Sequence, residues 1–293
     1  MKFAYVILHY NTYEITCKSV DSILKIKDNT SSIIVVDNCS DNKSGELLID
    51  RYKHNDDIDV IINKKNEGFA IGNNIGYYNA KYQKKADFII VLNNDVIISQ
   101  KDFEEQITNL YDLDKNNGII APRIINSLGQ NQNPFRTKKL SSLKKMKMMF
   151  GCILYYFCIV SKIFYPIGYK FFHVDSYHTH VTDKISEKGD IVPHGSCIIF
   201  TPSYVSKSDF AFVPITFFYG EEDILYDFIK SIKLNTFYSS RINVQHLEKV
   251  ATKTISDNSR KREKFQTRNK IIGNYKDLIF RIKLKIQEIT KRR

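Results

Sequence analysis

Polar side chains gather directly behind four short apolar runs in the first third of the chain. These polar segments are His9–Asn11, Asp37–Ser40, Asn63–Gly68 and Asn93–Asp95. If the apolar runs are parallel strands, their carboxyl ends meet at one edge of a sheet, where the ligands of such sheets bind. Carboxylates accept hydrogen bonds, and carboxylate and carbonyl oxygens are the ligands that hard cations such as Mg²⁺ prefer. The spacing therefore predicts a site for a polar ligand at that edge.

A second group of candidate residues lies in the last third of the chain. Glu221, Glu222 and Asp223 are consecutive acids at the start of a predicted helix. A carboxylate within reach of a hydroxyl can act as a general base, but the helix dipole also favours acids at this position. His246 follows a strand-like segment, Ile242–Gln245, and a single histidine is more often a structural or surface residue. Both interpretations stay open for each of these residues.

The elements that would position these residues follow from the hydrophobic pattern. Apolar runs of strand length alternate with segments whose apolar residues recur every three or four positions, as on a helix face. The predicted strands are Phe3–His9, Ser32–Asp37, Ile58–Asn63 and Asp87–Leu92, and the predicted helices are Thr12–Ile26, Lys43–Tyr52 and Phe69–Tyr82. This alternation predicts an α/β fold with a mostly parallel sheet that carries helices on both faces. Strand character returns at Asp190–Phe200.

The glycines do not fall where common phosphate-binding loops need them. The first predicted strand is followed by tyrosine, asparagine and threonine, so the chain has neither GxGxxG at that place nor a Walker A sequence. Gly68, Gly72 and Gly76 instead recur at every fourth position after the third predicted strand. On a helix they form one bare stripe, although each costs about 1 kcal/mol relative to alanine. The stripe indicates either close packing on the sheet or the close approach of a ligand.

The composition is that of a folded protein with an excess of positive charge. The 293 residues include 44 Lys and Arg against 32 Asp and Glu, a net charge of +12, and 43% hydrophobic residues. The five cysteines form no CxxC pair, which disfavours a zinc ribbon or a disulfide framework and favours a reducing compartment. The first residues lack the long apolar region and the cleavage site of a signal peptide. Nucleic acid, an anionic membrane and a phosphorylated ligand are the partners that such a charge could attract.

The positive charge is concentrated in two segments. Residues 247–293 hold 15 Lys and Arg and 5 Asp and Glu, which gives +10, and their pattern is that of an amphipathic helix. A second cluster precedes an apolar run at 148–160 and consists of Lys138, Lys139, Lys144, Lys145 and Lys147. That run is too short to cross a bilayer, which takes about 20 residues. A helix in a membrane interface and a core helix with a solvated basic flank both fit this second segment.

Three segments of the chain resemble the family 2 glycosyltransferases. They are VVDNCSDN at 35–42, NEGFAIGNNIG at 66–76 and LNNDV at 92–96. The later segments PHGSCIIF, FFYGEEDIL and VQH follow in the family's order, so the resemblance covers about residues 3–250. Within the family, the chain is most similar to bacterial enzymes that build surface polysaccharides such as O-antigen and capsule, including rhamnosyl- and galactofuranosyl-transferases.

The resemblance implies a GT-A fold, in which an α/β sheet binds a nucleotide-sugar and a later part of the chain binds the acceptor. On this basis residues 1–128 are the nucleotide-sugar-binding half. Residues 129–250 are the acceptor-binding half, which also carries the catalytic base. Residues 251–293 are a basic, amphipathic, helical tail.

On the donor side the resemblance implies a metal-assisted site. Asn93-Asn94-Asp95 matches the family's DxD motif with asparagine in the first place, so Asp95 would be the direct ligand of Mn²⁺ or Mg²⁺. His246 matches a family histidine that touches the metal or the diphosphate, and Asp37 matches an acid that accepts a hydrogen bond from the nucleobase. The residues implied to surround the nucleotide-sugar are His9, Asn11, Asp37, Asn38, Asn66, Gly68, Asn73, Asn93 and Asn94. The side chain of His9 is expected to be structural, with the backbone of this segment beside the base.

On the acceptor side the resemblance implies a general base at the start of a helix. Aligning Tyr219-Gly220-Glu221-Glu222 with the family's Glu-Asp pair makes Glu222 the base, and a shift by one residue makes it Asp223. Glu221, Gly195 and Ser196 match the wall of the acceptor site. A single attack of the acceptor hydroxyl inverts the configuration at the anomeric carbon, and no enzyme nucleophile is needed.

Together these features predict a metal-dependent, inverting glycosyltransferase. Its donor would be a UDP- or dTDP-sugar, and its acceptor a hydroxyl of a glycan linked to undecaprenyl diphosphate. A lipid-linked, anionic acceptor also accounts for the basic C-terminal half, so the enzyme is expected in the cytoplasm, peripheral to the inner face of the plasma membrane, without a nucleic-acid partner. One alternative is a nucleic-acid-binding protein that uses the basic tail, which leaves the acids at the strand ends unexplained. A nucleotidyltransferase is another, but it would need a glycine-rich basic loop after the first strand, and that loop is missing.

Overall fold

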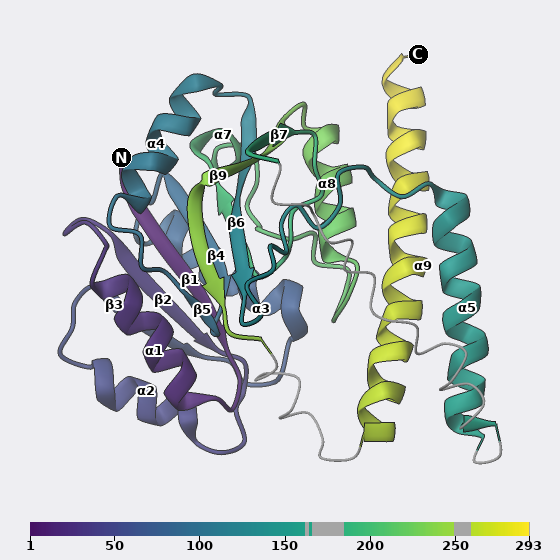
Figure 1. Cartoon of the computed structure of the whole chain (residues 1–293), viewed down its shortest axis with the longest axis horizontal. Coiled ribbons are helices and arrows are strands. Elements are labelled where there is room, and N and C mark those ends of the chain that lie inside the picture. Colours follow the sequence, from purple (N-terminus) through teal and green to yellow (C-terminus); the bar gives the residue numbers. More distant parts are fainter. Residues whose placement is uncertain (162–163, 166–184, 249–258, 293) are drawn as a thin grey trace.

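The computed structural model describes residues 1–161, 164–165, 185–248 and 259–292 (Figure 1). The strands are β1 Phe3–His9, β2 Ser32–Asp37, β3 Ile58–Ile62, β4 Phe88–Asn93, β5 Val96–Ile97, β6 Asn117–Asn126, β7 Glu187–Gly189, β8 Cys197–Phe200 and β9 Asn235–His246. The helices are α1 Tyr13–Leu24, α2 Ser44–Tyr52, α3 Gly68–Tyr82, α4 Phe103–Leu113, α5 Ser142–Val160, α7 Pro202–Val205, α8 Glu221–Ser231 and α9 Ser259–Arg292. Within the described residues, nine strands form one sheet in the order β3-β2-β1-β4-β8-β6-β9-β5, and β7 pairs with β9.

The first half of the sheet confirms the predicted α/β fold. Strands β3, β2, β1 and β4 are neighbours, and all of them run parallel. The helices between them begin and end within two residues of their predicted limits. In this register His9 lies opposite Asp37, and Leu8 lies opposite Asn93. The predicted polar segments therefore end up at the same edge of the sheet.

The second half of the sheet mixes strand directions. Strand β8 lies between β4 and β6 and runs antiparallel to both. Strand β9 runs parallel to β6, with a shift of register between Pro122 and Arg123. Its last residue, His246, lies opposite Val96 of the short antiparallel strand β5. The late part of the chain is thus brought to the residues that follow β4.

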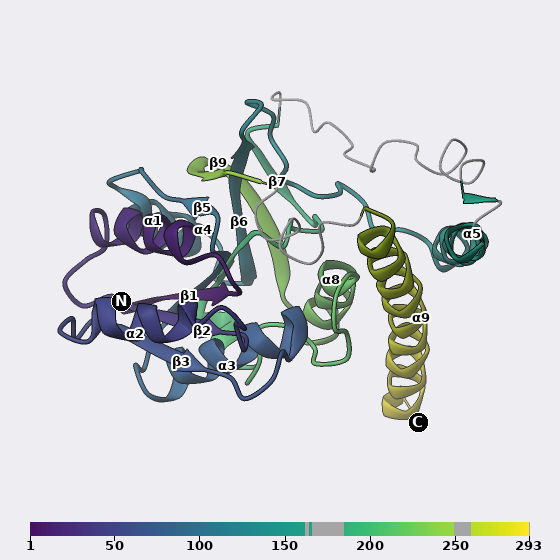
Figure 2. The same ribbon diagram turned by 90° about the horizontal axis from the view of Figure 1, so that it is seen from below.

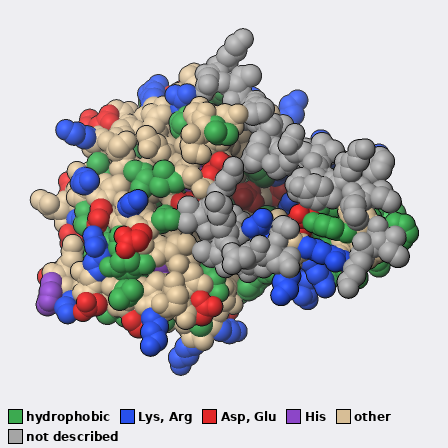
Figure 3. All heavy atoms as spheres, turned by 60° about the horizontal axis from the view of Figure 1, so that its bottom comes forward, with side chains coloured by type: hydrophobic (Ala, Val, Ile, Leu, Met, Phe, Trp, Pro, Cys, Tyr) green, Lys and Arg blue, Asp and Glu red, His purple; other side chains and the backbone are tan. Residues whose placement is uncertain are grey.

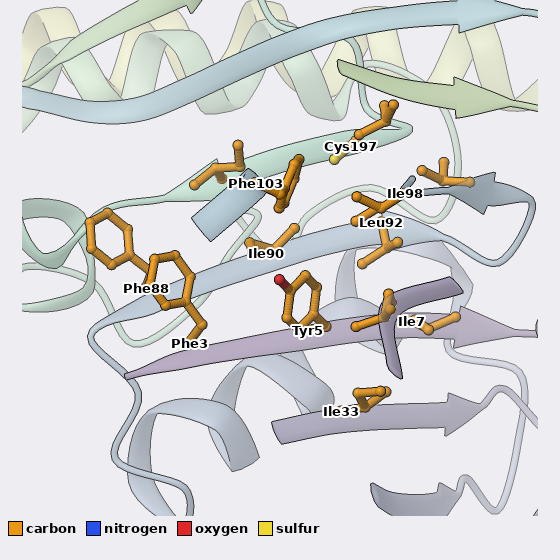
Figure 4. Packing of buried hydrophobic residues seen from close by; sticks show 14 of the residues in the cluster. Phe3, Tyr5, Ile7, Ile33, Phe88, Ile90, Leu92, Ile98, Phe103 and Cys197 are labelled. Atoms are coloured by element: carbon orange, nitrogen blue, oxygen red, sulfur yellow. The ribbon is translucent and has the colours of Figure 1, made fainter. Parts of the chain in front are cut away.

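The core lies on both faces of the sheet because strand side chains alternate between the faces. On one face Tyr5 and Ile7 of β1 pack with Phe103 of α4 and with α1 and α2, and Phe3 stacks on Phe88 at 4.7 Å between ring centroids (Figure 4). On the other face Val6 packs with α3, α7 and α8. Long buried apolar strands covered on both faces are typical of parallel sheets.

The glycine stripe of α3 is explained by packing on the sheet. A Cβ atom on Gly76 would lie 2.4 Å from Val6 Cγ1, and one on Gly72 would lie 2.7 Å from Leu8 Cδ1. Gly68 begins the helix with a φ of +74°, and its Cα faces the carbonyl oxygen of Phe217. Of the two explanations for this stripe, the structure supports close contact between helix and sheet.

Helices α5 and α9 form a pair beside the rest of the molecule, and they lie side by side in both Figure 1 and Figure 2. The Ser141 hydroxyl accepts a hydrogen bond from the backbone N–H of Lys144 and so caps the start of α5. The two helices run in opposite directions: Arg281 donates to the carbonyl of Leu140, whereas Arg260 donates to that of Ile159. Helix α9 also packs against α8. No helix in the described ranges is both long and apolar enough to cross a bilayer.

Candidate active site

The carboxyl edge of the parallel strands brings together the segments that the sequence singled out. Asp37 ends β2, Asn93 ends β4, and Asp95 follows two residues later. The backbone N–H of Asn38 donates to the carbonyl of His9, and that of Asn63 donates to the carbonyl of Asp37. These bonds continue the pairing of the strands into the loops, so the loops at this edge are fixed relative to one another.

The Asp37 carboxylate is buried at the start of α2. It accepts hydrogen bonds from the backbone N–H of Ser40, at 3.2 and 3.3 Å to its two oxygens, and from the Ser40 hydroxyl. A Cβ atom on Gly45 would lie 2.5 Å from Asp37 Oδ2, so the helix approaches the carboxylate as closely as glycine allows. Burial raises the pKa of Asp37, and the two bonds from Ser40 oppose that rise.

The side chains of His9 and Asn94 are engaged inside the protein. His9 is fully buried, with Nδ1 2.7 Å from the Thr16 hydroxyl and Nε2 2.7 Å from that of Ser44. Burial lowers the pKa of His9 to about 4, so the ring is neutral at pH 7. The Asn94 amide donates to the Thr16 hydroxyl at 2.9 Å. Both residues support the edge, in agreement with the structural role expected for the side chain of His9.

The Asn38 side chain ties β2 to the loop before α3. Its Oδ1 accepts from Asn63 Nδ2 at 3.1 Å and from the backbone N–H of Glu67 at 3.0 Å. Its Nδ2 donates to Asn66 Oδ1 and to the carbonyl of Gly68, both at 3.1 Å. With four bonds made, Asn38 holds the loop in place, and the loop presents its backbone to the edge.

Asn11 and Asn73, two further asparagines singled out by the sequence, differ in whether their side-chain oxygen is already hydrogen-bonded. Asn11 has a φ of +59°, and its N–H donates to the Ser40 hydroxyl at 2.8 Å. Its Oδ1 accepts from the backbone N–H of Asp41. Asn73 donates from Nδ2 to the carbonyl of Phe69, one turn earlier in α3, while its buried Oδ1 has no hydrogen-bond partner among the described residues. Asn73 therefore keeps an unused acceptor.

Asp95 and His246 form a pair through the β5–β9 contact. His246 Nε2 lies 3.2 Å from Asp95 Oδ1, and the N–H of Leu247 donates to the carbonyl of Asp95 at 2.9 Å. His246 Nδ1 lies 2.8 Å from Gln132 Oε1, while Gln132 Nε2 donates to Glu248. Because Gln132 thereby turns its oxygen to the ring, a proton is assigned to Nδ1, and Nε2 is the ring nitrogen that faces Asp95.

This arrangement fits a divalent cation between the two side chains. His246 Nε2 and Asp95 Oδ1 face each other at 3.2 Å, and no other side chain in the described part of the chain bonds to this oxygen. In residues 1–161, 164–165, 185–248 and 259–292 no cluster of three metal-binding side chains occurs. Two protein ligands are what a Mg²⁺-type site shared with substrate phosphates uses. The hydrogen bond to Gln132 fixes the orientation of the ring, as hydrogen-bond partners of metal-binding histidines commonly do.

Gly195 and Ser196 join the donor edge to the acid-rich helix α8. The N–H of Asn93 donates to the carbonyl of Ser196 at 2.9 Å. A Cβ atom on Gly195 would lie 2.8 Å from Glu222 Oε1, so the Glu222 carboxylate lies against the Gly195 backbone. Asn93 therefore lies between two parts of the site. It is two residues before Asp95 in the chain, and its bond to Ser196 links it to the Gly195 backbone beside Glu222.

Sequence reasoning missed two residues of this site. His194 lies 2.9 Å through Nδ1 from the Ser196 hydroxyl, and its ring is 5.9 Å from that of His246 between centroids. Its position directly before Gly195, in a segment already singled out, was an available signal. Gln132 has no such signal, because it lies in a polar turn-rich loop, and only the fold brings it to His246.

The three consecutive acids of α8 have different surroundings. Burial raises the pKa of Glu221 to about 8. Burial also raises the pKa of Glu222, which forms no ion pair with any described residue. Asp223 instead contacts Arg136 and Lys145 Nζ, the latter at 2.8 Å, and these cations outweigh the effect of burial and lower its pKa.

Asp223 belongs to a buried charge network that ties α8 to the helix pair. Lys145 of α5 is 1% exposed and also contacts Asp277 of α9 at 2.8 Å. Arg281 of α9 contacts Asp277 at 3.1 Å. The members of the buried charge network are Arg136, Lys139, Lys145, Asp223, Asp227, Asp277 and Arg281.

Helix α9 also supports the turn that presents Glu222. Gly220 precedes α8 with a φ of +95°, a conformation that favours glycine. A Cβ atom on Gly273 of α9 would lie 2.1 Å from the carbonyl oxygen of Tyr219. Helix α9 therefore crosses the start of α8 in close backbone contact, and the position of Glu222 depends on both.

A nucleotide-sugar-type α/β sheet, with acids at its carboxyl edge and a second acid group delivered from the C-terminal half, defines the GT-A class of glycosyltransferase folds. The chain belongs to glycosyl transferase family 2, whose family model matches residues 5–172. This confirms the family and the fold that the sequence motifs predicted.

Individual relatives agree with this assignment. Over 117 residues the chain is 33% identical to the low-salt glycan biosynthesis hexosyltransferase Agl10 of Haloferax volcanii, across 38% of this chain and 35% of that protein. A structure of GalNAc-T7 with UDP, GalNAc and Mn²⁺ matches 85% of this chain and 44% of its own, with a TM-score of 0.58 and 13% identity. S. aureus TarS 1–349 in complex with UDP-GlcNAc matches 85% of this chain and 59% of its own, with a TM-score of 0.54 and 13% identity. The chain spans less than two thirds of each of these relatives, and the two structures show a shared fold.

Proposed function

We propose that this protein is a metal-assisted, inverting glycosyltransferase. It moves a sugar from a UDP- or dTDP-sugar to a hydroxyl of a growing glycan. The observation that carries the proposal is the continuity of the site: the Asn93–Ser196 hydrogen bond joins the Asp95–His246 pair to the Gly195 backbone, on which Glu222 lies. A donor and an acceptor placed on the two sides of this bond would meet between them.

On the donor side, Asp37 accepts a hydrogen bond from a ring N–H of the base. Asp37 lies at the same edge as Asn11, whose N–H donates to Ser40, and as the loop held by Asn38. Asn66, Gly68, Asn73 and Asn93 line the path toward the sugar. The bound UDP and UDP-GlcNAc named for the structural relatives support a uridine-type donor.

Asp95 and His246 would hold Mn²⁺ or Mg²⁺, which when bound would offset the negative charge that develops on the leaving diphosphate. Asp95 would supply a hard oxygen ligand, and His246 would bind through Nε2, the ring nitrogen that does not contact Gln132. The Mn²⁺ named with GalNAc-T7 supports this use of a metal. A metal bound by Asp95 and His246 would also hold the diphosphate at the carboxyl edge of the sheet.

Glu222 takes the proton of the attacking hydroxyl. Asp223 matches the family pattern after a shift of one residue, but its carboxylate is engaged with Arg136 and Lys145. Glu222 has no such partner among the described residues, and a raised pKa makes it a stronger base than an exposed glutamate. Glu221 is mostly protonated at pH 7 and can donate a hydrogen bond to the acceptor. Gly195 and Ser196, beside Glu222, form the wall of the acceptor side in this proposal.

The acceptor is a glycan carried on undecaprenyl diphosphate during the synthesis of a surface polysaccharide such as O-antigen or capsule, at the inner face of the plasma membrane. The glycan biosynthesis role named for Agl10 supports an oligosaccharide acceptor. The net charge of +12 supports an anionic carrier. Helix α9, which carries many of the basic side chains, packs against α8, the helix of Glu222.

The test is transfer with purified enzyme over a panel of UDP- and dTDP-sugars, with Mn²⁺ or Mg²⁺ and with chelator. Glu222→Gln should leave donor binding unchanged and lower kcat by about 10²–10⁴-fold. Asp95→Asn should weaken metal-dependent donor binding, and Asp209→Asn, at an exposed ion pair, serves as the control.

Two results would count against these assignments. If no sugar nucleotide in the panel binds in a metal-dependent way, the donor site is wrong. If transfer survives in Glu222→Gln and is lost in Asp223→Asn, the base is Asp223. The anomeric configuration of the product, measured by NMR, tests inversion directly.

A further inference from the structure

The outward side of α5 carries a continuous stripe of large apolar side chains. Its members, the α5 stripe, are between 43% and 67% exposed and are Leu143, Met146, Phe150, Leu154 and Phe157. Their spacing of three and four residues places them on one side of the helix, along roughly 20 Å at 1.5 Å per residue. Isolated exposed apolar residues are ordinary, but a contiguous row of this length marks an interaction surface.

The α5 stripe faces away from the rest of the protein. Helix α9 takes the opposite side of α5, where Lys145 contacts Asp277 and the Tyr155 hydroxyl donates to Glu263 at 2.6 Å. Ile159, on that same side, is 1% exposed. The packing of α5 on the protein is therefore satisfied by its inner side, and the described part of the chain leaves the stripe exposed.

The charge around the stripe is of one sign. From Pro134 to Val174 the sequence has no Asp or Glu. Lys144 and Lys147 are exposed in the first two turns of α5, beside the stripe. Figure 3 shows that the side of the molecule with the helix pair presents both basic and hydrophobic side chains. An anionic surface complements this pattern, whereas the same face of a second copy would bring no acid to pair with the lysines.

The end of α9 is also basic and apolar, with Glu288 as one exposed acid. Near the start of α5, where Arg281 meets Leu140, the exposed apolar residues Ile282 and Ile286 alternate with the exposed Lys283 and Lys285. Apolar side chains bordered by lysines are what helices lying in the plane of a membrane interface present. Such lysines contribute about 1 kcal/mol each near an anionic lipid surface.

We propose that the α5 stripe, together with the end of α9, docks the protein on an anionic bilayer. The apolar side chains enter the boundary between headgroups and acyl chains, and the neighbouring lysines contact lipid phosphates. The buried charge network links this surface to the active site, because Lys145 of α5 contacts Asp223, the neighbour of Glu222. This proposal rests on the proposed function, because docking would bring the active site to a lipid-linked acceptor. Vesicle binding can nevertheless be measured without any sugar transfer.

The first test is co-sedimentation of the full chain with phosphatidylcholine vesicles that contain or lack phosphatidylglycerol. The triple variant Phe150→Ser/Leu154→Ser/Phe157→Ser should bind the anionic vesicles at least roughly tenfold more weakly than the native chain, because three large apolar groups no longer leave water. The matched control is Leu47→Ser/Ile49→Ser/Leu113→Ser, which removes three comparably exposed apolar residues elsewhere and should bind as the native chain does.

The second test uses the absence of tryptophan from the sequence. In Phe150→Trp the single indole should shift its emission to the blue with anionic vesicles and be quenched by lipids brominated on their acyl chains. In Leu113→Trp neither change should occur. This readout does not depend on how the triple variant folds.

The proposal is overturned if the native chain does not bind anionic vesicles, or if the α5 triple variant binds them as well as the control variant does. It is also overturned if the triple substitution abolishes a dimer and leaves vesicle binding unchanged, since the stripe would then face a second copy. Binding of UDP- and dTDP-sugars by calorimetry separates the two proposals: vesicle binding can fail while donor binding persists, and the reverse.

Discussion

Glu222 and Asp223 are neighbours in the chain, yet their carboxylates meet different surroundings. Burial disfavours the charged form of both, and for Asp223 the cations Lys145 and Arg136 reverse the effect. For Glu222 burial dominates, the charge of Asp223 adds to it, and the same two cations oppose it from farther away. The pKa of Glu222 is therefore raised mainly by burial, while Asp223 adds to the rise and the cations Arg136 and Lys145 limit it.

The pH dependence of transfer tests this balance. With Glu222 as the proposed base, transfer needs this carboxylate ionised, so the rate should fall as the pH drops through its raised pKa. Lys145→Met removes a cation that favours the ionised form, so the acid limb of the kcat profile should move to higher pH. A movement of one pH unit lowers the rate roughly tenfold on that limb and leaves the alkaline plateau unchanged.

The matched control for this measurement is Lys139→Met. Lys139 pairs with Asp227 and does not contact Asp223, so its removal should leave the limb in place. If both variants shift the limb equally, the effect reflects the general loss of positive charge and not the contact of Lys145. A limb that stays in place in Lys145→Met would argue against Glu222 as the base.

At the scale of elements, close contact between α3 and β1 is maintained by residues that lack a side chain. Gly76→Ala places a methyl group against Val6 and Val36, which should lower the free energy of unfolding by about 1–3 kcal/mol. Gly151→Ala is the matched control, since a Cβ atom there meets nothing within 4 Å in the middle of α5. That change should be neutral or raise stability by up to about 1 kcal/mol.

Urea denaturation followed by circular dichroism measures both variants. Equal stability of the two would mean that α3 can move away from the sheet at little cost. In that case the glycine stripe would need a ligand to explain it, which is the other interpretation of the sequence.

Sequence pattern predicted the parallel half well because each of its elements is local. A run such as Ser32–Asp37 is apolar throughout because both of its faces are covered, and that is visible without knowing its partners. Pairing between distant segments is not visible in this way. Nothing in the segment Cys197–Phe200 shows that it lies between β4 and β6.

The residues of the candidate site also differ in whether a local pattern or a distant contact reveals them. Asp37, Asp95 and Glu222 follow or begin elements whose ends could be read from the pattern. In the sequence Lys145 was only one member of a basic cluster, yet in the structure it is buried. Its burial could not be predicted because its partner Asp277 lies more than a hundred residues away in the chain. A buried cation can be recognised only once both of its acids are placed beside it.

At the scale of the whole molecule, the basic tail is a structural part of the protein. Helix α9 supplies Asp277 and Arg281 to the buried charge network and Gly273 to the turn before α8. Most of the net charge of +12 therefore sits on an element that also supports α8, the helix of the proposed base. This changes how the tail can be used to examine membrane binding.

Two truncations separate these roles. Ending the chain after residue 258 removes partners of Lys145 and Asp227, so the melting temperature and transfer should both fall sharply. Ending it after Lys285 keeps Arg281 and removes Ile286 and Ile289, so folding and donor binding should persist while vesicle affinity falls. Thermal melting and vesicle co-sedimentation measure the two effects. If the chain that ends after residue 258 melts at the same temperature as the native chain and still transfers sugar, α9 does not support α8.

Strand β8 has a consequence for recombination between relatives of this protein. Because Leu92 pairs with Cys197 and Ile120 with Ile199, the two halves share one set of backbone hydrogen bonds rather than meeting at an interface. A chimera that takes its donor half from one relative and its acceptor half from another must keep β8 with its neighbours β4 and β6. A crossover near residue 201 keeps β8 with β4 and β6 but joins β9 of one relative to β6 of the other. One near residue 128 separates β8 from both of its neighbours and β9 from β6, so it should give the larger loss of soluble product.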